Sequence, residues 1–358
     1  MKRLIILAFT AALFTACHST PAPEPSKPSV TPVFAKGADV SWVSEMEKDG
    51  RTFKKKDGTV ADIMEVLKET GVNAVRLRVW VNPEGGWSGK ADMVKLAARA
   101  DKAGLAVMVD FHYSDFFADP GRQTIPAAWE ADKKDVDLMA QHVFDHTTDV
   151  LQALKNAGVT PAWVQVGNET RNGMLWPTGQ LWTESGDVPH GRANFAKLLS
   201  AGYDATKAIF PSALVLAHLD NAYADNAWWF EQIKLAGGQY DAIALSHYPQ
   251  TAANMTAKQC NEAAVKRIKE LIDKFGVPVV VSEVGVKTFE NETQAASVLF
   301  EFVTAVRKIS SCIGVFYWEP EVDGKWKPAA YGPLGWNAYQ MGAFTTDGKA
   351  TSVMDAFK

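Results

Sequence analysis

The sequence has little cysteine, no excess of positive charge and no apolar N-terminal run long enough to cross a membrane. Three cysteines occur in 358 residues, and no CxxC pair or Cys/His cluster has the spacing of a metal site. Lys and Arg number 37 against 41 Asp and Glu, a formal charge of -4, which argues against a nucleic-acid-binding surface. The apolar run Leu4–Phe14 is too short for a transmembrane helix.

Apolar and aromatic residues are abundant instead. Hydrophobic residues make up 47% of the chain and charged residues 22%, which allows a large core and excludes global disorder. The length fits two domains of about 150 residues, or one α/β barrel of about 250 residues with insertions. The 12 Trp, 8 Tyr and 18 Phe either pack the core or line a cleft in which sugar rings stack on flat aromatic faces. Composition alone leaves both interpretations open.

The N-terminal region predicts export. Two positive residues precede the run Leu4–Phe14, as in a secretory signal peptide. The segment Phe14-Thr15-Ala16-Cys17 resembles a bacterial lipobox, whose cleavage leaves a lipid on Cys17; ordinary signal-peptidase cleavage is the alternative. A Pro-rich segment follows, typical of an extended tether. We expect a signal peptide over 1–16, lipidated Cys17 and tether over 17–32, and a catalytic domain over 33–358. The lipid would hold the domain at a membrane, facing the periplasm or the cell surface.

Eight short β-branched or apolar runs follow the tether, with helical patterns between them. The predicted strands are Gly37–Trp42, Ala74–Trp80, Ala106–His112, Trp163–Glu169, Leu214–Asp220, Ala242–Tyr248, Pro278–Glu283 and Ile313–Trp318. The helical patterns cover Val60–Gly71, Ala91–Gly104, Lys134–Gly158, Ala193–Phe210, Asn261–Gly276 and Glu292–Lys308. Apolar strands that alternate with helices indicate a parallel sheet. Eight such units in one chain favour a single α/β domain, a (β/α)8 TIM barrel, over two open sheets.

Polar and aromatic residues gather at the carboxyl ends of these strands, where barrel enzymes carry their working residues. They are Asp39, Trp42, Arg76, Arg78, Trp80, Asp110, His112, Asn168, Glu169, His218, Asp220, His247, Tyr248, Glu283, Trp318 and Glu319. Buried charges need partners, so this concentration predicts a hydrated cleft. On the same interpretation Cys260 and Cys312 lie near opposite ends of the barrel, which argues against a disulfide even in an oxidising periplasm.

Two of these residues, Glu169 and Glu283, end the fourth and the seventh strand. Those strands face each other across an eight-stranded barrel, so both side chains can enter one cleft. Paired carboxylates are what glycosidic cleavage requires, one to protonate the leaving oxygen and one to attack the anomeric carbon or activate water. An isolated strand-end Glu is more often the partner of a surface ion pair, but two at opposed strand ends favour the catalytic interpretation.

Several motifs resemble glycoside hydrolase family 53, the arabinogalactan endo-β-1,4-galactanases, within the retaining clan A. They are residues 36–41 (KGADVS), 73–83 (NAVRLRVWVNP), 110–115 (DFHYSD), 166–169 (VGNE) and 316–320 (FYWEP), and the resemblance extends from about Lys36 to Lys358. It implies a retaining endo-β-1,4-galactanase acting on β-1,4-galactan and its oligosaccharides. Another clan A β-glycanase, such as a β-mannanase or cellulase, and a non-catalytic glycan-binding lipoprotein are the alternatives.

The resemblance also implies residue roles, with Glu169 as general acid/base, Glu283 as nucleophile and Asn168 holding the sugar 2-hydroxyl. The nucleophile must stay ionised and so needs donors, which Arg76 or Arg78 and His247 or Tyr248 can supply. The predicted substrate-binding set is Asn168, Arg76, Arg78, His112, Asp115, His247, Tyr248, Trp318, Trp80, Trp129 and Trp336. No cofactor is expected. The loop 286–293 is short and lacks clustered Asp, so we expect no calcium ion there.

Overall fold

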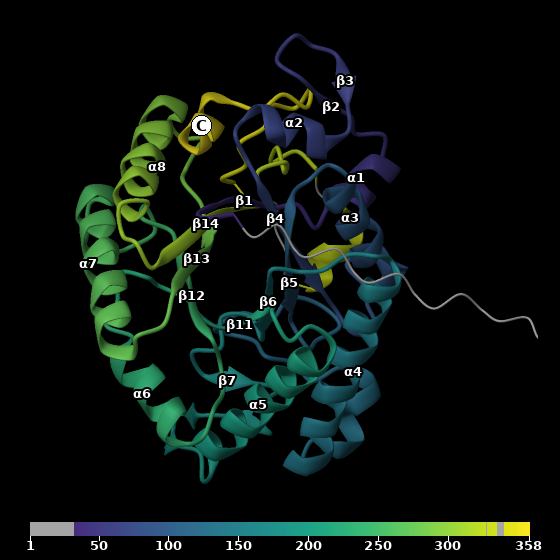
Figure 1. Ribbon diagram of the computed structural model, residues 1–358, viewed down its shortest axis with the longest axis vertical. Helices are drawn as coiled ribbons and strands as arrows, with labels where there is room; N and C mark the ends of the chain where they lie inside the picture. The colour runs from purple at the N-terminus through teal and green to yellow at the C-terminus, as the bar shows by residue number, and fades with distance from the viewer. Residues whose placement is uncertain (1–31, 327, 335–339) are drawn as a thin grey trace, which may run out of the picture.

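The computed structural model describes residues 32–326, 328–334 and 340–358. Eight parallel strands close into one barrel with helices packed around it (Figure 1). In the order of their hydrogen-bonded neighbours they are β1 (Ala35–Asp39), β14 (Cys312–Trp318), β13 (Val279–Val284), β12 (Ala242–His247), β11 (Leu214–Leu219), β6 (Trp163–Val166), β5 (Ala106–Phe111) and β4 (Ala74–Val79). Strand β4 pairs back onto β1 and closes the ring. The predicted (β/α)8 barrel is confirmed. The predicted signal peptide, Cys17 and nearly all of the tether lie outside the described residues.

Six of the helices that surround the barrel correspond to predicted helical segments, and two were not predicted. They are α1 (Val43–Lys48), α2 (Ile63–Glu69), α3 (Lys90–Lys102), α4 (Val136–Asn156), α5 (Gly191–Ile209), α6 (Ala227–Leu235), α7 (Ala257–Phe275) and α8 (Glu292–Val306). The short helices α1 and α6 have no counterpart among the six predicted helices. Helix α2 begins later than predicted because the Asp62 side chain accepts the Met64 N–H and caps it there.

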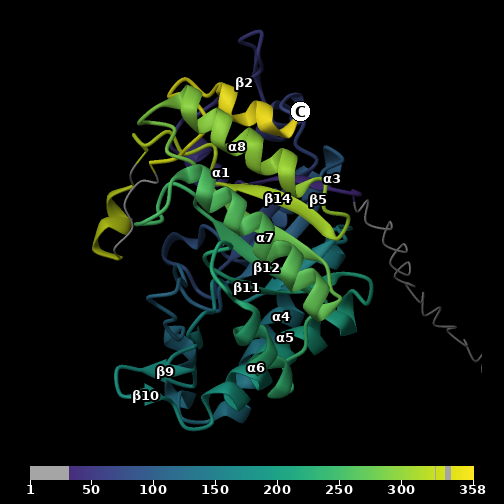
Figure 2. The same ribbon diagram turned by 90° about the vertical axis from the view of Figure 1, so that its left-hand side faces the viewer.

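Short secondary elements decorate the loops. Three two-stranded antiparallel pairs form from β2 (Phe53–Lys54) with β3 (Val60–Ala61), β7 (Gly173–Met174) with β8 (Gly179–Gln180), and β9 (Trp182–Thr183) with β10 (Gly186–Asp187). The 3-10 turns are η1 (Glu84–Gly86), η2 (Ala127–Asp132), η3 (Ala329–Leu334) and η4 (Ser352–Phe357). The β9–β10 pair belongs to the long β6–α5 connection and projects from the body of the molecule (Figure 2).

The barrel interior changes from apolar to polar along its axis. At the amino ends of the strands it is filled by a separate core cluster, in which Trp163 and Phe316 meet edge to face at 5.8 Å. Alternate residues of a strand face inward, so β4 presents Ala74, then Arg76, to the interior. Toward the carboxyl ends of the strands, the barrel therefore holds buried polar side chains from many strands. A larger apolar cluster lies between the strands and the helices.

Two further features bear on the sequence-based predictions. Cys260 on α7 and Cys312 at the start of β14 are both free and buried. Over the described part of the chain, no helix combines the length and the apolar character that a membrane span needs.

Candidate active site

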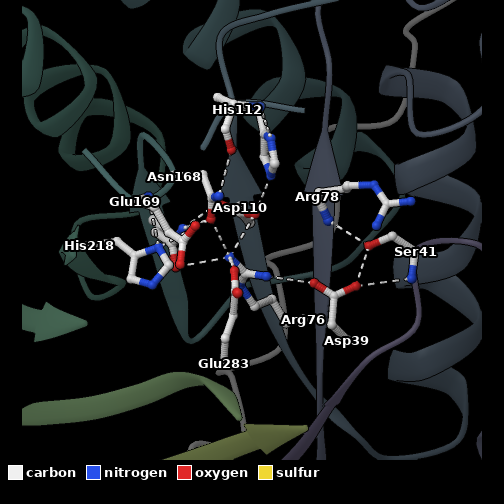
Figure 3. A network of polar contacts seen from close by, with 12 residues as sticks. Asp39, Ser41, Arg76, Arg78, Asp110, His112, Asn168, Glu169, His218 and Glu283 are labelled. Atoms are coloured by element: carbon white, nitrogen blue, oxygen red, sulfur yellow. Dashed lines mark hydrogen bonds and ion pairs between the residues drawn. The ribbon is translucent and has the colours of Figure 1, made fainter. Parts of the chain in front are cut away.

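Arg76 is the centre of the polar layer at the carboxyl ends of the strands. Its guanidinium group lies 2.7 Å from Asp39, 2.9 Å from Asp110 and 2.9 Å from Glu283, and it donates to Asn168 Oδ1 at 2.8 Å (Figure 3). Burial disfavours the charged form of Arg76, but the surrounding carboxylates outweigh it and raise its pKa above the ordinary value. This cation therefore joins strands β1, β4, β5, β6 and β13 around one point.

Glu283 reaches the interior through an irregularity of strand β13. Val280 faces the barrel interior, so strict alternation would turn Ser282 inward and Glu283 toward the helices. The pairing with β12 instead skips one residue, running from Leu245↔Val281 to Ser246↔Glu283. A bulge of this kind re-aims the side chains beyond it. It brings Glu283 onto the inward face beside Ser246.

Glu283 is buried and held by two donors. Arg76 lies 2.9 Å from Oε1, and the Tyr248 hydroxyl donates to Oε2 at 2.8 Å. Burial raises the pKa of Glu283 to about 7, while Arg76 and the Tyr248 hydrogen bond act to lower it. The two donors thus favour the ionised form in a site that would otherwise neutralise it.

Glu169 is placed by a tight turn after strand β6. Gly167 has φ 82°, which a residue with a side chain rarely adopts, and an added Cβ would meet Thr170 at 2.6 Å. Glu169 itself has φ 46°, and its main-chain N–H donates to His218 Nδ1 at 3.1 Å. The predicted strand therefore ends at Val166, three residues early. The turn lifts the partly exposed Glu169 side chain to the barrel mouth.

The pKa values of both glutamates are raised, and that of Glu169 is raised more. Burial and the nearby negative charge of Glu283 raise the pKa of Glu169 well above its ordinary value. Arg76 contacts Glu283, whereas no ion pair of Glu169 is found among the described residues. Figure 3 shows both side chains extending toward the Arg76 region from different strands. Environments that separate two carboxyl pKa values assign the acid and the nucleophilic role.

Aromatic side chains surround the mouth. Trp318 ends strand β14 and is partly exposed, with Phe117 at 6.2 Å and Tyr248 at 6.5 Å, both edge to face. Two adjoining cavities of about 470 and 570 Å³ lie between the loops after β4, β5 and β14. Both are lined by Asp115, Phe116 and Leu334. Phe117 lines the larger cavity and lies beside Trp318, so the two cavities form a groove along the rim next to Trp318.

Comparison with known proteins shows which family the chain belongs to. The family model described as "Glycosyl hydrolase family 53" matches residues 35–357. The chain belongs to glycosyl hydrolase family 53. It is 32% identical over 347 residues to an arabinogalactan endo-beta-1,4-galactanase of Thermothelomyces thermophilus, covering 90% of this chain and 98% of that protein.

A bacterial relative and a solved structure extend this finding. An arabinogalactan endo-beta-1,4-galactanase of Cellvibrio japonicus is 34% identical over 342 residues, covering 88% of this chain and 86% of that protein. A structure described as one of two fungal beta-1,4-galactanases superposes with a TM-score of 0.77 at 29% identity, covering 90% of this chain and 98% of the other.

In this family 53 protein, several predicted site residues meet around Arg76 and others do not. Asn168 contacts Arg76, and Tyr248 contacts Glu283, as described above. His112 lies 2.9 Å from Asp110, which is itself a partner of Arg76, and it accepts the Ala118 N–H through Nδ1. Asp115 accepts the main-chain N–H groups of Asn82 and Ala127 and so ties two rim loops together. Trp336 lies outside the described residues.

His247 was predicted to face the cleft, and the structure corrects this. Alternation along β12 turns Ser246 inward and His247 outward. His247 is fully buried between the strand and the helices, where Nε2 lies 2.8 Å from Asn261 on α7 and the ring packs on Phe302 of α8 at 4.1 Å. It therefore cannot assist Glu283 directly.

The expected positions of Trp80, Trp129 and Arg78 are also corrected. Trp80 is 1% and Trp129 7% exposed, so neither ring offers an open face to a sugar. Trp129 stacks on His142 at 5.2 Å. Arg78 pairs with Glu319 at 2.8 Å instead of with Glu283, and its guanidinium group lies 4.2 Å above the Trp42 ring.

Two residues of the polar layer were missing from the predicted set of strand-end residues. Gln165 donates to Asp110, and Ser246 lies 2.9 Å from His218 Nε2. Each lies two residues beyond an inward-facing apolar residue, Trp163 or Ala244. The period of two would have identified them once the inward face was fixed. Among the described residues, no group of three His, Cys, Asp or Glu is arranged to hold a metal ion.

Proposed function

We propose that this family 53 hydrolase cleaves β-1,4-galactan internally with retention of configuration, using Glu283 as nucleophile and Glu169 as general acid/base. The observation that carries the proposal is that two glutamates at one barrel mouth have different surroundings. Glu283 receives two donors, whereas burial and the charge of Glu283 raise the pKa of Glu169 and favour its protonated form. The names of the relatives as arabinogalactan endo-beta-1,4-galactanases support the choice of substrate.

The mechanism follows from these contacts. Glu283 attacks the anomeric carbon while Glu169 gives its proton to the leaving glycosidic oxygen, forming a covalent glycosyl-enzyme. Glu169, now ionised, then takes a proton from water, which attacks the same carbon and releases Glu283. Arg76 and Tyr248 hold Glu283 in place and favour its charge before attack.

Asn168 and Trp318 are proposed to bind the reacting sugar. Asn168 Nδ2 donates to the Ala118 carbonyl at 2.8 Å, and a second hydrogen on this nitrogen remains for the sugar 2-hydroxyl. That hydrogen bond would strengthen in the transition state. Trp318 offers its partly exposed ring as a floor beneath the sugar. The groove formed by the two adjoining cavities fits attack within a polymer better than a closed pocket would.

The test is hydrolysis of linear β-1,4-galactan by Glu169→Gln and Glu283→Gln variants. We expect internal cleavage by the wild type, with oligosaccharides appearing before galactose, and a loss of at least about 10²-fold in kcat/KM in each variant. Glu301→Gln, on the exposed face of α8, is the matched control and should keep wild-type activity. Cleavage of mannan or cellulose in place of galactan would contradict the substrate, and glycan binding without cleavage would contradict the enzyme.

The cellular location is proposed from the sequence. We propose export followed by lipidation of Cys17, with residues 17–32 as a tether to the domain. Val33, fully exposed, precedes the amino end of β1, so the tether joins the domain on the face opposite the barrel mouth. Labelling with a radioactive fatty acid in a bacterial host should mark the wild type and leave Cys17→Ser unlabelled. Equal labelling of both would contradict the proposal.

A further inference from the structure

Two buried residues of the polar layer have no part in the mechanism above. His218 on β11 and Ser246 on β12 face the barrel interior beneath Glu169 and are fully buried. His218 Nδ1 lies 3.1 Å from the Glu169 main-chain nitrogen, and Nε2 lies 2.9 Å from Ser246 Oγ. Ser246 is hydrogen-bonded in turn to the Glu169 side chain, so the two residues bridge from the main chain of Glu169 to its own carboxyl group.

We propose that His218 and Ser246 position the acid/base Glu169, because the Glu169 main-chain N–H fixes the tautomer of His218 and His218 in turn directs the Ser246 hydroxyl onto the Glu169 carboxyl. This inference rests on the proposed role of Glu169 as acid/base. It assigns both residues as positioning residues, since neither touches the substrate.

The direction of each hydrogen bond follows from the main-chain N–H, which cannot reorient. It donates to His218 Nδ1 at 3.1 Å, so Nδ1 must carry a lone pair. A neutral imidazole then carries its hydrogen on Nε2, which donates to Ser246 Oγ at 2.9 Å. Because Ser246 accepts from His218, its own hydrogen is available to Glu169.

A second contact of Nδ1 would by itself favour the other tautomer. Asn168 Oδ1 lies 3.1 Å from Nδ1, and a hydrogen there would point toward it. However, Asn168 Oδ1 already accepts from Arg76 at 2.8 Å and from Gln165 at 3.2 Å. A hydrogen on Nδ1 would also oppose the Glu169 N–H. The lone pair on Nδ1 leaves every donor in the group with an acceptor.

His218 also secures the turn that carries Glu169. Its carbonyl oxygen accepts the Thr170 N–H at 2.9 Å and the Thr170 hydroxyl at 3.0 Å. With the Glu169 N–H on its ring, His218 receives three hydrogen bonds from two consecutive residues. Glu169 has the unusual φ of 46°, and these bonds oppose its relaxation to a more common conformation.

The ring stays neutral because of its surroundings. Burial, above all, lowers the pKa of His218 well below its ordinary value; Arg76 and His112 act in the same direction, and Asp110 opposes them. Glu283, Asp220 and Asp119 are the charged groups that face Glu169, and all three favour its protonated form. The Ser246 hydrogen bond favours the ionised form.

The test is the pH profile of kcat/KM for Ser246→Ala. The alkaline limb reports loss of the Glu169 proton, and removing a donor to the carboxylate should move that limb to higher pH by about one unit. Ser246→Thr keeps the hydroxyl and should keep the wild-type limb. Ser44→Ala is the control, because Ser44 is buried on α1 and its hydroxyl has no partner among the described residues.

The outcomes are distinguishable. A uniform loss of rate at every pH with an unmoved alkaline limb would overturn the positioning role and leave the role of Glu169 intact. Wild-type activity in Glu169→Gln would instead overturn the proposed function itself. As a second measurement, ¹⁵N NMR of the histidines should show His218 protonated on Nε2 at neutral pH, with the signal identified by its absence in His218→Gln. Protonation on Nδ1 would contradict the inference.

Discussion

At the scale of single residues, the account depends on where a few protons lie. As the proposed nucleophile, Glu283 must be ionised before it attacks, yet burial raises its pKa to about 7. Arg76 and Tyr248 are the two groups that oppose this effect, at 2.9 and 2.8 Å. Arg76 also holds Asp39 and Asp110, so its replacement would disturb the whole polar layer. Tyr248 is the residue whose single hydroxyl can be removed cleanly.

Tyr248→Phe should therefore change the acid limb of the activity profile. Without the hydroxyl the pKa of Glu283 rises further, so the acid limb of kcat/KM, which reports ionisation of the nucleophile, moves to higher pH by up to about one unit. Tyr240→Phe is the matched control, because the Tyr240 hydroxyl is buried without a partner among the described residues. An acid limb that stays in place in Tyr248→Phe would show that this hydroxyl does not tune Glu283.

At the scale of elements, the sequence predicted the eight strands but not which side of each strand faces inward. A period of two identifies the inward face of β12 once Ala244 is known to lie inside, and it then separates Ser246 from His247. The bulge in β13 breaks that period, and no residue pattern in the strand predicts it. Glu283 was nonetheless expected in the cleft, because the prediction used its position at the end of the seventh strand and not the alternation along it.

The outward position of His247 leads to a prediction for β12. His247→Ala should lower the free energy of unfolding by about 1 to 3 kcal/mol, because the packing on Phe302 is lost and Asn261 Oδ1 loses its contact with the ring. It should leave kcat/KM within a few-fold of the wild type under conditions where the variant is folded. Urea unfolding and galactan hydrolysis measure the two effects. A large loss of kcat in a stable variant would return His247 to the active site.

At the scale of the whole molecule, the alternation of strands and helices was sufficient to predict one closed barrel. The architecture is repetitive, and each βα unit carries its own apolar pattern, so local signals add up. The cleft was harder to predict, because exposure of an aromatic ring depends on loops that meet from distant parts of the chain. Phe117, for example, lies between Trp80 and Trp318, and it buries the first while leaving the second partly exposed.

The placement of the two ends of the barrel also has a consequence for the proposed lipoprotein. The strands are parallel, so Val33 lies at their amino ends and the candidate site at their carboxyl ends. A lipid on Cys17 would hold the domain by the face away from its mouth. Polymer chains in solution would then reach the groove without passing between the protein and the membrane.

The central claim is that Glu283 forms a covalent bond to the sugar. The most direct measurement is to trap that intermediate with an activated 2-deoxy-2-fluoro galactobioside, whose fluorine destabilises the oxocarbenium-like transition state, and to map the label by peptide mass spectrometry. The account predicts a stoichiometric mass increase on the peptide that contains Glu283, and none in Glu283→Gln. A label on another residue, or turnover with inverted anomeric configuration and no label, would contradict it.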